Sequence, residues 1–172
     1  MAAYVQAHHP KVHLWSPQLP PSPQAALQCI ALGTADWPQH GRAVVGSSLG
    51  GYYASAVAQQ WCCRSAMINP AVFPARDLTR YIGEQTHWHD PSERFFFAPA
   101  YIAELEAMDC RHMPPAGPEL LIAAQGDEVL DWREMLARYP HAQLRLVPGS
   151  NHALTDFDQH ISALIAFLML AE

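Results

Sequence analysis

The residues best placed to do chemistry lie in the pentapeptide Gly46-Ser47-Ser48-Leu49-Gly50. It has the pattern G-x-S-x-G between an apolar run and a helical pattern, the setting of a nucleophilic serine on a sharp strand-to-helix turn. Ser48 stands at the centre and is the predicted nucleophile, whereas we assign Ser47 to the turn. The glycines permit the turn, and the backbone N–H of Leu49, at the positive end of the helix, would face an oxyanion.

A serine hydroxyl needs a base to become a good nucleophile, and the base needs an acid to orient it. Asp127 is the predicted acid, because it comes off the end of a late apolar run, residues 120–124. Glu128 and Asp131 remain alternatives. They are weaker because Asp131 is expected to start the next helix.

His152 is the predicted base, because it follows the apolar run that ends at Val147. Strand and loop would bring it to the same sheet edge as Ser48 and Asp127. Other histidines are less suitably placed: His8 and His9 precede the first predicted strand, His40 precedes the nucleophile strand, and His160 lies in the final helix.

Metal binding is not predicted from the remaining histidines and cysteines. His87 and His89 could form a metal pair, but no third ligand has a convincing spacing. The four cysteines also lack metal-ligand spacing and are expected to be reduced thiols: Cys29, Cys62, Cys63 and Cys110.

The elements that must position these residues alternate between short apolar runs and helical patterns, which indicates a parallel sheet covered by crossover helices. Five strands are predicted, at residues 12–15, 42–46, 66–69, 120–124 and 143–147. Several are too uniformly apolar to have one wet face, as expected of strands buried on both sides.

Four helices accompany these strands. Ser22 can cap the first, Pro23 suits its first position, and Gly33 can adopt a left-handed conformation past its end. The second is expected over residues 49–61, with an apolar stripe of Tyr53, Val57 and Trp61. The others are predicted at residues 132–138 and about 156–170, the last with this buried stripe: Ile161, Leu164, Ile165 and Leu168.

The alternation of strands and helices is interrupted between residues 74 and 118, where two predicted strands are separated by more residues than a simple crossover needs. We interpret this segment as a cap or lid insertion within a single domain of residues 1–172. Its aromatic residues could line an apolar pocket over the catalytic edge, or they could form the insertion's own small core: Tyr81, Trp88, Phe95, Phe96, Phe97 and Tyr101.

Composition excludes several classes of protein. The 172 residues are 50% hydrophobic and 15% charged, as in an ordinary globular domain. A net charge of -6 offers no basic stripe for phosphates, so no nucleic-acid partner is expected. No signal peptide or membrane-spanning stretch is evident, which predicts a soluble, cytoplasmic protein.

Several segments resemble the YqiA/YcfP esterase family of bacterial α/β hydrolases: Val45-Gly46-Ser47-Ser48-Leu49-Gly50-Gly51-Tyr52-Tyr53-Ala54, Ile68-Asn69-Pro70-Ala71, Gly126-Asp127-Glu128-Val129-Leu130-Asp131, Asn151-His152-Ala153 and Pro17-Gln18-Leu19-Pro20-Pro21. The resemblance spans nearly the whole chain. It implies an α/β-hydrolase fold and a small esterase or thioesterase acting on acyl esters without a cofactor. Ser48, Asp127 and His152 fall on the family's triad positions.

One departure from the family concerns the start of the chain. The resemblance implies a first strand beside the nucleophile strand, ending in a His-Gly-Phe-type loop that supplies a second oxyanion-hole amide, and no such segment is present. We therefore expect an exposed sheet edge, possible homo-oligomers through it, and weak ester turnover that an upstream extension would restore. The alternative function is a binding or interaction module with an incomplete oxyanion hole.

Overall fold

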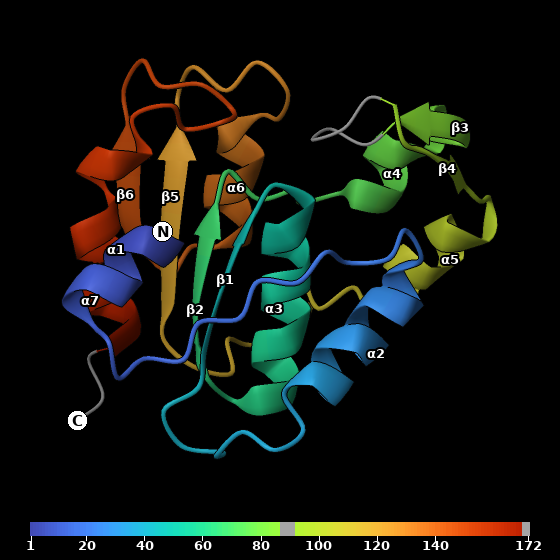
Figure 1. Cartoon of the computed structure of the whole chain (residues 1–172). Helices are drawn as coiled ribbons and strands as arrows, with labels where there is room; N and C mark the ends of the chain where they lie inside the picture. Colours follow the sequence, from blue (N-terminus) through green and yellow to red (C-terminus); the bar gives the residue numbers. More distant parts are fainter. Residues whose placement is uncertain (87–91, 170–172) are drawn as a thin grey trace.

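The computed structural model, which describes residues 1–86 and 92–169, contains a parallel sheet with helices on both faces (Figure 1). Its four strands are β1 (Ala43–Ser47), β2 (Arg64–Ile68), β5 (Glu119–Ala124) and β6 (Gln143–Val147), in the order β1-β2-β5-β6. Ser47 is paired with Ile68, and Ala124 with Val147. The carboxyl ends of the strands therefore lie at one edge of the sheet, the upper edge in Figure 1.

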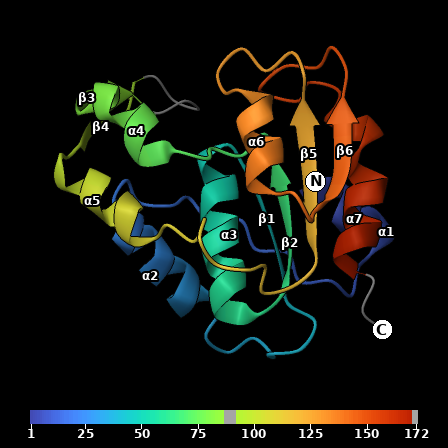
Figure 2. The same cartoon turned by 180° about the vertical axis from the view of Figure 1, so that it is seen from behind.

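The central strand β5 is buried on both faces, which explains why its sequence is apolar without alternation. Leu120 and Ile122 belong to one core cluster, together with Leu164 of α7 (Ile161–Met169). Leu121 belongs to another, with Met135 of α6 (Trp132–Arg138). The helix α7 therefore covers one face of the sheet and α6 the other, on the same side as α3 (Figure 2).

Helix α3 (Leu49–Trp61) has the predicted bounds and packs on β1 and β2. It ends where Cys62 adopts a left-handed conformation with φ of 50°. Tyr53 and Val57 of the predicted stripe are buried, and Trp61 is half-buried. Because α3 starts directly after β1, its first turn lies at the carboxyl edge of the sheet, where the predicted nucleophile must be.

The first predicted strand, residues 12–15, is wrong. These residues follow the short helix α1 (Ala2–His8) without regular secondary structure, and no described strand pairs with them. A strand needs hydrogen-bonding partners for its backbone, and an open groove separates this segment from β1. The N-terminal segment is anchored instead by α1, where Val5 packs against Ile161 and Ile165.

Two helix ends differ from the prediction. Helix α2 (Pro23–Gly33) begins as expected, since Ser22 accepts a hydrogen bond from the Ala25 N–H, but Gly33 is its last residue and not a left-handed cap. A Cβ at Gly33 would lie 2.4 Å from the Trp15 ring, so packing explains this glycine. The final helix is split into η2 (Phe157–Gln159) and α7, with His160 between them.

The segment predicted to be an insertion contains α4 (Pro74–Leu78), η1 (Thr79–Tyr81), the antiparallel hairpin β3 (Gly83–Thr86) and β4 (Arg94–Phe97), and α5 (Ala100–Ala107). Figure 1 shows it beside α2, away from α7. Phe97 is buried against Tyr101, with the ring centroids 5.4 Å apart. Phe95 and Tyr101 pack on the same core cluster, which also contains Tyr52 and Tyr53.

These contacts favour the second interpretation of the insertion's aromatic residues, that they form a small core. Tyr81 and Phe96 are exposed, at 41% and 58%, and Trp88 lies outside the described residues.

No helix in the described ranges is both long and apolar enough to cross a membrane.

Candidate active site

Ser48 lies on a strained turn between β1 and α3. Its φ of 53° is in the left-handed region that non-glycine residues rarely adopt. Two hydrogen bonds join the turn to the end of β2 and the residues after it: the Ser48 N–H donates to the Ile68 carbonyl at 3.0 Å, and the Ala71 N–H donates to the Ser48 carbonyl at 3.0 Å. The turn therefore depends on the segment that follows β2.

Gly46 makes this turn sterically possible. A Cβ at Gly46 would lie 1.9 Å from the Gly50 carbonyl oxygen, a distance that no side chain could tolerate. A Cβ at Gly50 would meet nothing within 4 Å. The two glycines of the pentapeptide thus differ: the first is required by the close approach of α3 to β1, and the second is not.

The structure brings the three predicted side chains together. Ser48 Oγ lies 2.9 Å from His152 Nε2, and His152 Nδ1 lies 2.8 Å from Asp127 Oδ2. The three residues come from the loops after β1, β5 and β6, all at the same sheet edge. The His152 side chain keeps 20% of its surface exposed, so the ring can be reached from solvent.

Both carboxylate oxygens of Asp127 have hydrogen-bond partners. Its side chain is fully buried, and while Oδ2 faces the imidazole, Oδ1 accepts hydrogen bonds from the N–H groups of Val129 and Leu130, both at 2.8 Å. A buried carboxylate needs such donors. They leave Oδ2 directed at His152 Nδ1, which favours the tautomer that carries its proton on Nδ1.

The two alternative acids have other contacts. Glu128 Oε2 accepts a hydrogen bond from the backbone N–H of His152 at 3.0 Å, which lowers the pKa of the Glu128 carboxyl. Asp131 caps α6 by accepting from the Arg133 N–H at 2.9 Å. Glu128 therefore holds the histidine loop and Asp131 the helix, and neither is hydrogen-bonded to the His152 ring.

No metal-binding group of three histidine, cysteine or acidic residues occurs within the described ranges. The pair that could have suggested one, His87 and His89, lies outside these ranges. His160, which follows His152 in the chain, is buried, and its Nε2 lies 3.3 Å from Asp156 Oδ2.

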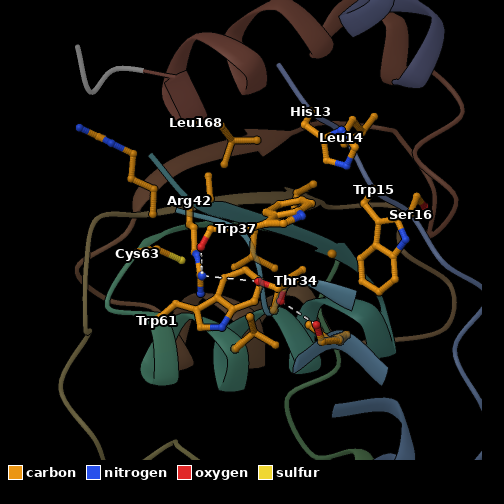
Figure 3. A pocket seen from close by; sticks show the side chains of 18 of the residues that line it. His13, Leu14, Trp15, Ser16, Thr34, Trp37, Arg42, Trp61, Cys63 and Leu168 are labelled. Carbon is orange, nitrogen blue, oxygen red and sulfur yellow. Dashed lines mark hydrogen bonds between the residues drawn. The ribbon is translucent and has the colours of Figure 1, made fainter. Parts of the chain in front are cut away.

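A groove of about 650 Å³ lies along the free edge of β1 (Figure 3). The N-terminal segment, with Trp15, forms one wall, and Trp61 and Cys63 lie across from it. Burial raises the pKa of the Cys63 thiol to about 11. The groove extends to Gly46 and Gly50, which flank Ser48. In the described sheet, β1 pairs only with β2, so its other edge opens onto this groove.

Sequence reasoning did not assign a role to Asn69, although it stands in one of the segments that resemble the esterase family. It is completely buried directly after β2, and its side chain makes hydrogen bonds to the loop that carries His152 and to the end of β5, which precedes Asp127. The prediction placed Asn69 at the end of the strand at residues 66–69, whereas β2 ends at Ile68. A polar residue at the carboxyl end of an apolar strand, at the same edge as the other three, was the available signal.

The parallel sheet, its helices and the serine turn define the class of protein: the chain has an α/β-hydrolase fold. Solved structures with this fold are similar to it over most of its length. Est1E from Butyrivibrio proteoclasticus is 17% identical, with a TM-score of 0.62 over 87% of this chain and 70% of that chain. An alpha/beta superfamily hydrolase from Oenococcus oeni PSU-1 is 15% identical, with a TM-score of 0.59 over 89% and 77%.

The esterase domain from a Rhodothermus marinus protein is 18% identical, with a TM-score of 0.57 over 83% of this chain and 66% of that one. At such identities the likeness establishes the fold. The family is established separately, because the model of the uncharacterised protein family UPF0227 matches residues 1–169. The chain belongs to this family, which is the YqiA/YcfP esterase family that its motifs resemble.

Proposed function

We propose that the protein is a serine hydrolase that cleaves acyl esters or thioesters through Ser48, His152 and Asp127. The observation that carries the proposal is the unbroken chain of hydrogen-bond distances from Asp127 Oδ2 through the His152 ring to Ser48 Oγ, 2.8 and 2.9 Å. Membership of an esterase family and the α/β-hydrolase fold support the same reaction class.

In the proposed reaction, Ser48 Oγ attacks the acyl carbonyl carbon while His152 Nε2 takes the hydroxyl proton. The tetrahedral intermediate collapses, the C–O or C–S bond of the substrate breaks, and the leaving group takes the proton from His152. A water molecule, deprotonated by His152, then attacks the acyl-serine and releases the acid and Ser48. Asp127 holds the imidazole tautomer and stabilises the imidazolium that forms twice in the cycle.

The negative charge of each tetrahedral intermediate would be stabilised by the N–H of Leu49. This amide is the first of α3, and the first N–H groups of a helix have no intrahelical acceptor. The positive end of the helix dipole adds to its effect. The segment of residues 74–118 is proposed to cover the substrate side of the site, as a cap within a single domain.

The test is hydrolysis of a panel of chromogenic acyl esters and thioesters. A structure of Est1E holds bound ferulic acid, so the panel includes an aryl acyl ester beside the linear acyl chains. Ser48→Ala and His152→Ala should each abolish turnover with the fold intact, and the double variant should be little worse than either, because the residues act as a unit. Ser47→Ala is the matched control and should retain activity; full activity in Ser48→Ala would refute the proposal.

A second candidate function is favoured by the free edge of β1. An unpaired strand edge is a template for another chain, so the protein could serve as an interaction module with an impaired catalytic site. This alternative predicts binding without turnover, and the turnover of the substrate panel separates the two functions.

A further inference from the structure

Asn69 is a completely buried polar residue close to the candidate active site, and the proposed reaction does not use it. It follows β2 directly, its relative exposure is 0%, and its φ of 41° is left-handed. Asparagine tolerates that conformation better than most residues. A buried amide at a strained backbone position is costly unless its hydrogen bonds are satisfied.

The Asn69 side chain makes hydrogen bonds to the loop that carries His152 and to the end of strand β5. Nδ2 donates to the carbonyl oxygens of Asn151 and His152, at 3.1 and 2.9 Å. Oδ1 accepts from the N–H of Ala124 at 2.8 Å. Ala124 ends β5, three residues before Asp127, so a single amide group joins the end of the strand that precedes the acid to the loop of the histidine.

The backbone around Asn69 ties in the nucleophile as well. The Asn69 N–H donates to the Ile122 carbonyl of β5 at 2.9 Å. Ile68, directly before Asn69, and Ala71, two residues after it, make the two backbone hydrogen bonds that join this segment to Ser48. The turn that contains Asn69 therefore contacts the turn of Ser48, the loop of His152 and the strand β5 that leads to Asp127.

We infer that Asn69 is a positioning residue, which fixes the distances between Asp127, His152 and Ser48 through the backbone of β5, of the histidine loop and of the serine turn. The inference rests on the proposed function. The role requires two donors and one acceptor in one plane, which an amide provides and a carboxylate does not. An aspartate here would place a carboxylate against the carbonyls of Asn151 and His152.

The consequence for catalysis follows from geometry. A misplacement of about 1 Å in a reacting group can cost on the order of a hundredfold in rate. Loss of the amide would let the histidine loop move relative to Asp127 without removing any group that touches substrate. Turnover should therefore fall while substrate binding is retained.

The test compares Asn69→Gly with Ser55→Ala in the full chain. Glycine suits the left-handed backbone, so Asn69→Gly removes the side-chain hydrogen bonds without adding backbone strain. Ser55 is the control, because it is also buried, at 5%, and its hydroxyl bonds Tyr139 at 2.8 Å and so joins α3 to α6. Both variants should lose stability.

Two readouts separate positioning from simple destabilisation. With an acyl ester as the probe, Asn69→Gly should lower kcat by about ten- to a hundredfold and leave KM within about a factor of two, whereas Ser55→Ala should leave kcat near the wild-type value. In proton NMR, the low-field signal of the His152 Nδ1 proton, which reports its bond to Asp127, should weaken or disappear in Asn69→Gly alone.

The outcomes also distinguish this inference from the proposed function. An unchanged His152 signal and a kcat within threefold of wild type in Asn69→Gly would overturn the inference, as would equal losses of kcat in the two variants. If the wild-type chain has no turnover, the proposed function fails, and the His152 signal still decides whether Asn69 positions the ring.

Discussion

Replacement of Gly46 by alanine should abolish the proposed ester turnover, whereas the same replacement at Gly50 should not. The Cβ of Gly46→Ala would lie 1.9 Å from the Gly50 carbonyl oxygen, and ordinary contact begins at about 3.4 Å. The first turn of α3 would have to move from β1 by about 1.5 Å to relieve this contact. The atoms in collision are backbone atoms, so no rotamer change can relieve it.

Ser48 lies between these two glycines, so a shift of that size would break its 2.9 Å contact with His152 Nε2. We expect turnover to fall by about a hundredfold or more. Overpacking of this kind costs roughly 1–3 kcal/mol of stability, which corresponds to a fall in Tm of several degrees for a chain of this size. The assay is kcat on the best ester of the panel, with Tm from circular dichroism.

Gly50→Ala is the matched control. Its Cβ would enter open space, and alanine is better than glycine in a helix by about 1 kcal/mol. Its Tm should be equal to or above that of the wild type, with activity retained. If Gly46→Ala keeps wild-type turnover, or if the two variants lose it equally, the close approach of α3 to β1 does not position Ser48.

Three other predictions follow from the contacts described above. Asp127→Asn should reduce kcat by roughly 10⁴-fold with the fold retained, because the amide favours the wrong histidine tautomer; loss of activity in Asp131→Asn instead would mean that the acid is misassigned. Burial raises the pKa of the Glu119 carboxyl above 4.5, so the folded state binds that proton more tightly than the unfolded state does, and stability falls as pH rises past this value. Glu119→Gln should therefore raise Tm at pH 7 and change it little near pH 4. A rise in Tm near pH 4 with none at pH 7 would contradict this direction. The 172-residue chain should self-associate through the free edge of β1, which sedimentation velocity over a range of concentrations measures; a monomer at all of them would contradict this.

The sequence could predict the parts of the fold that obey local rules. Helices α3 and α6 and strand β6 have the predicted bounds, because apolar spacing and chain punctuation determine them. The grouping of Ser48, Asp127 and His152 at one edge was also predictable. Each follows an apolar run, and parallel strands bring their carboxyl ends together.

The remaining features depend on neighbours that are distant in sequence. Residues 12–15 have the composition of a strand, but a strand is defined by its partner, and β1 does not pair with them. The sequence predicts a left-handed helix cap at Gly33, whereas in the structure the close approach of the Trp15 ring explains why this residue is a glycine. The role of Asn69 was hidden for the same reason, because two of its three side-chain contacts are with a loop that comes more than eighty residues later.

Covalent labelling by an alkyl fluorophosphonate tests the central claim most directly, because such reagents react with a serine activated by its base. Intact-mass measurement of the labelled chain, followed by peptide mapping, locates the adduct. We predict a single adduct on Ser48, retained in Ser47→Ala and lost in both Ser48→Ala and His152→Ala. A chain that takes up no label, or that carries it on any residue other than Ser48, would contradict the account.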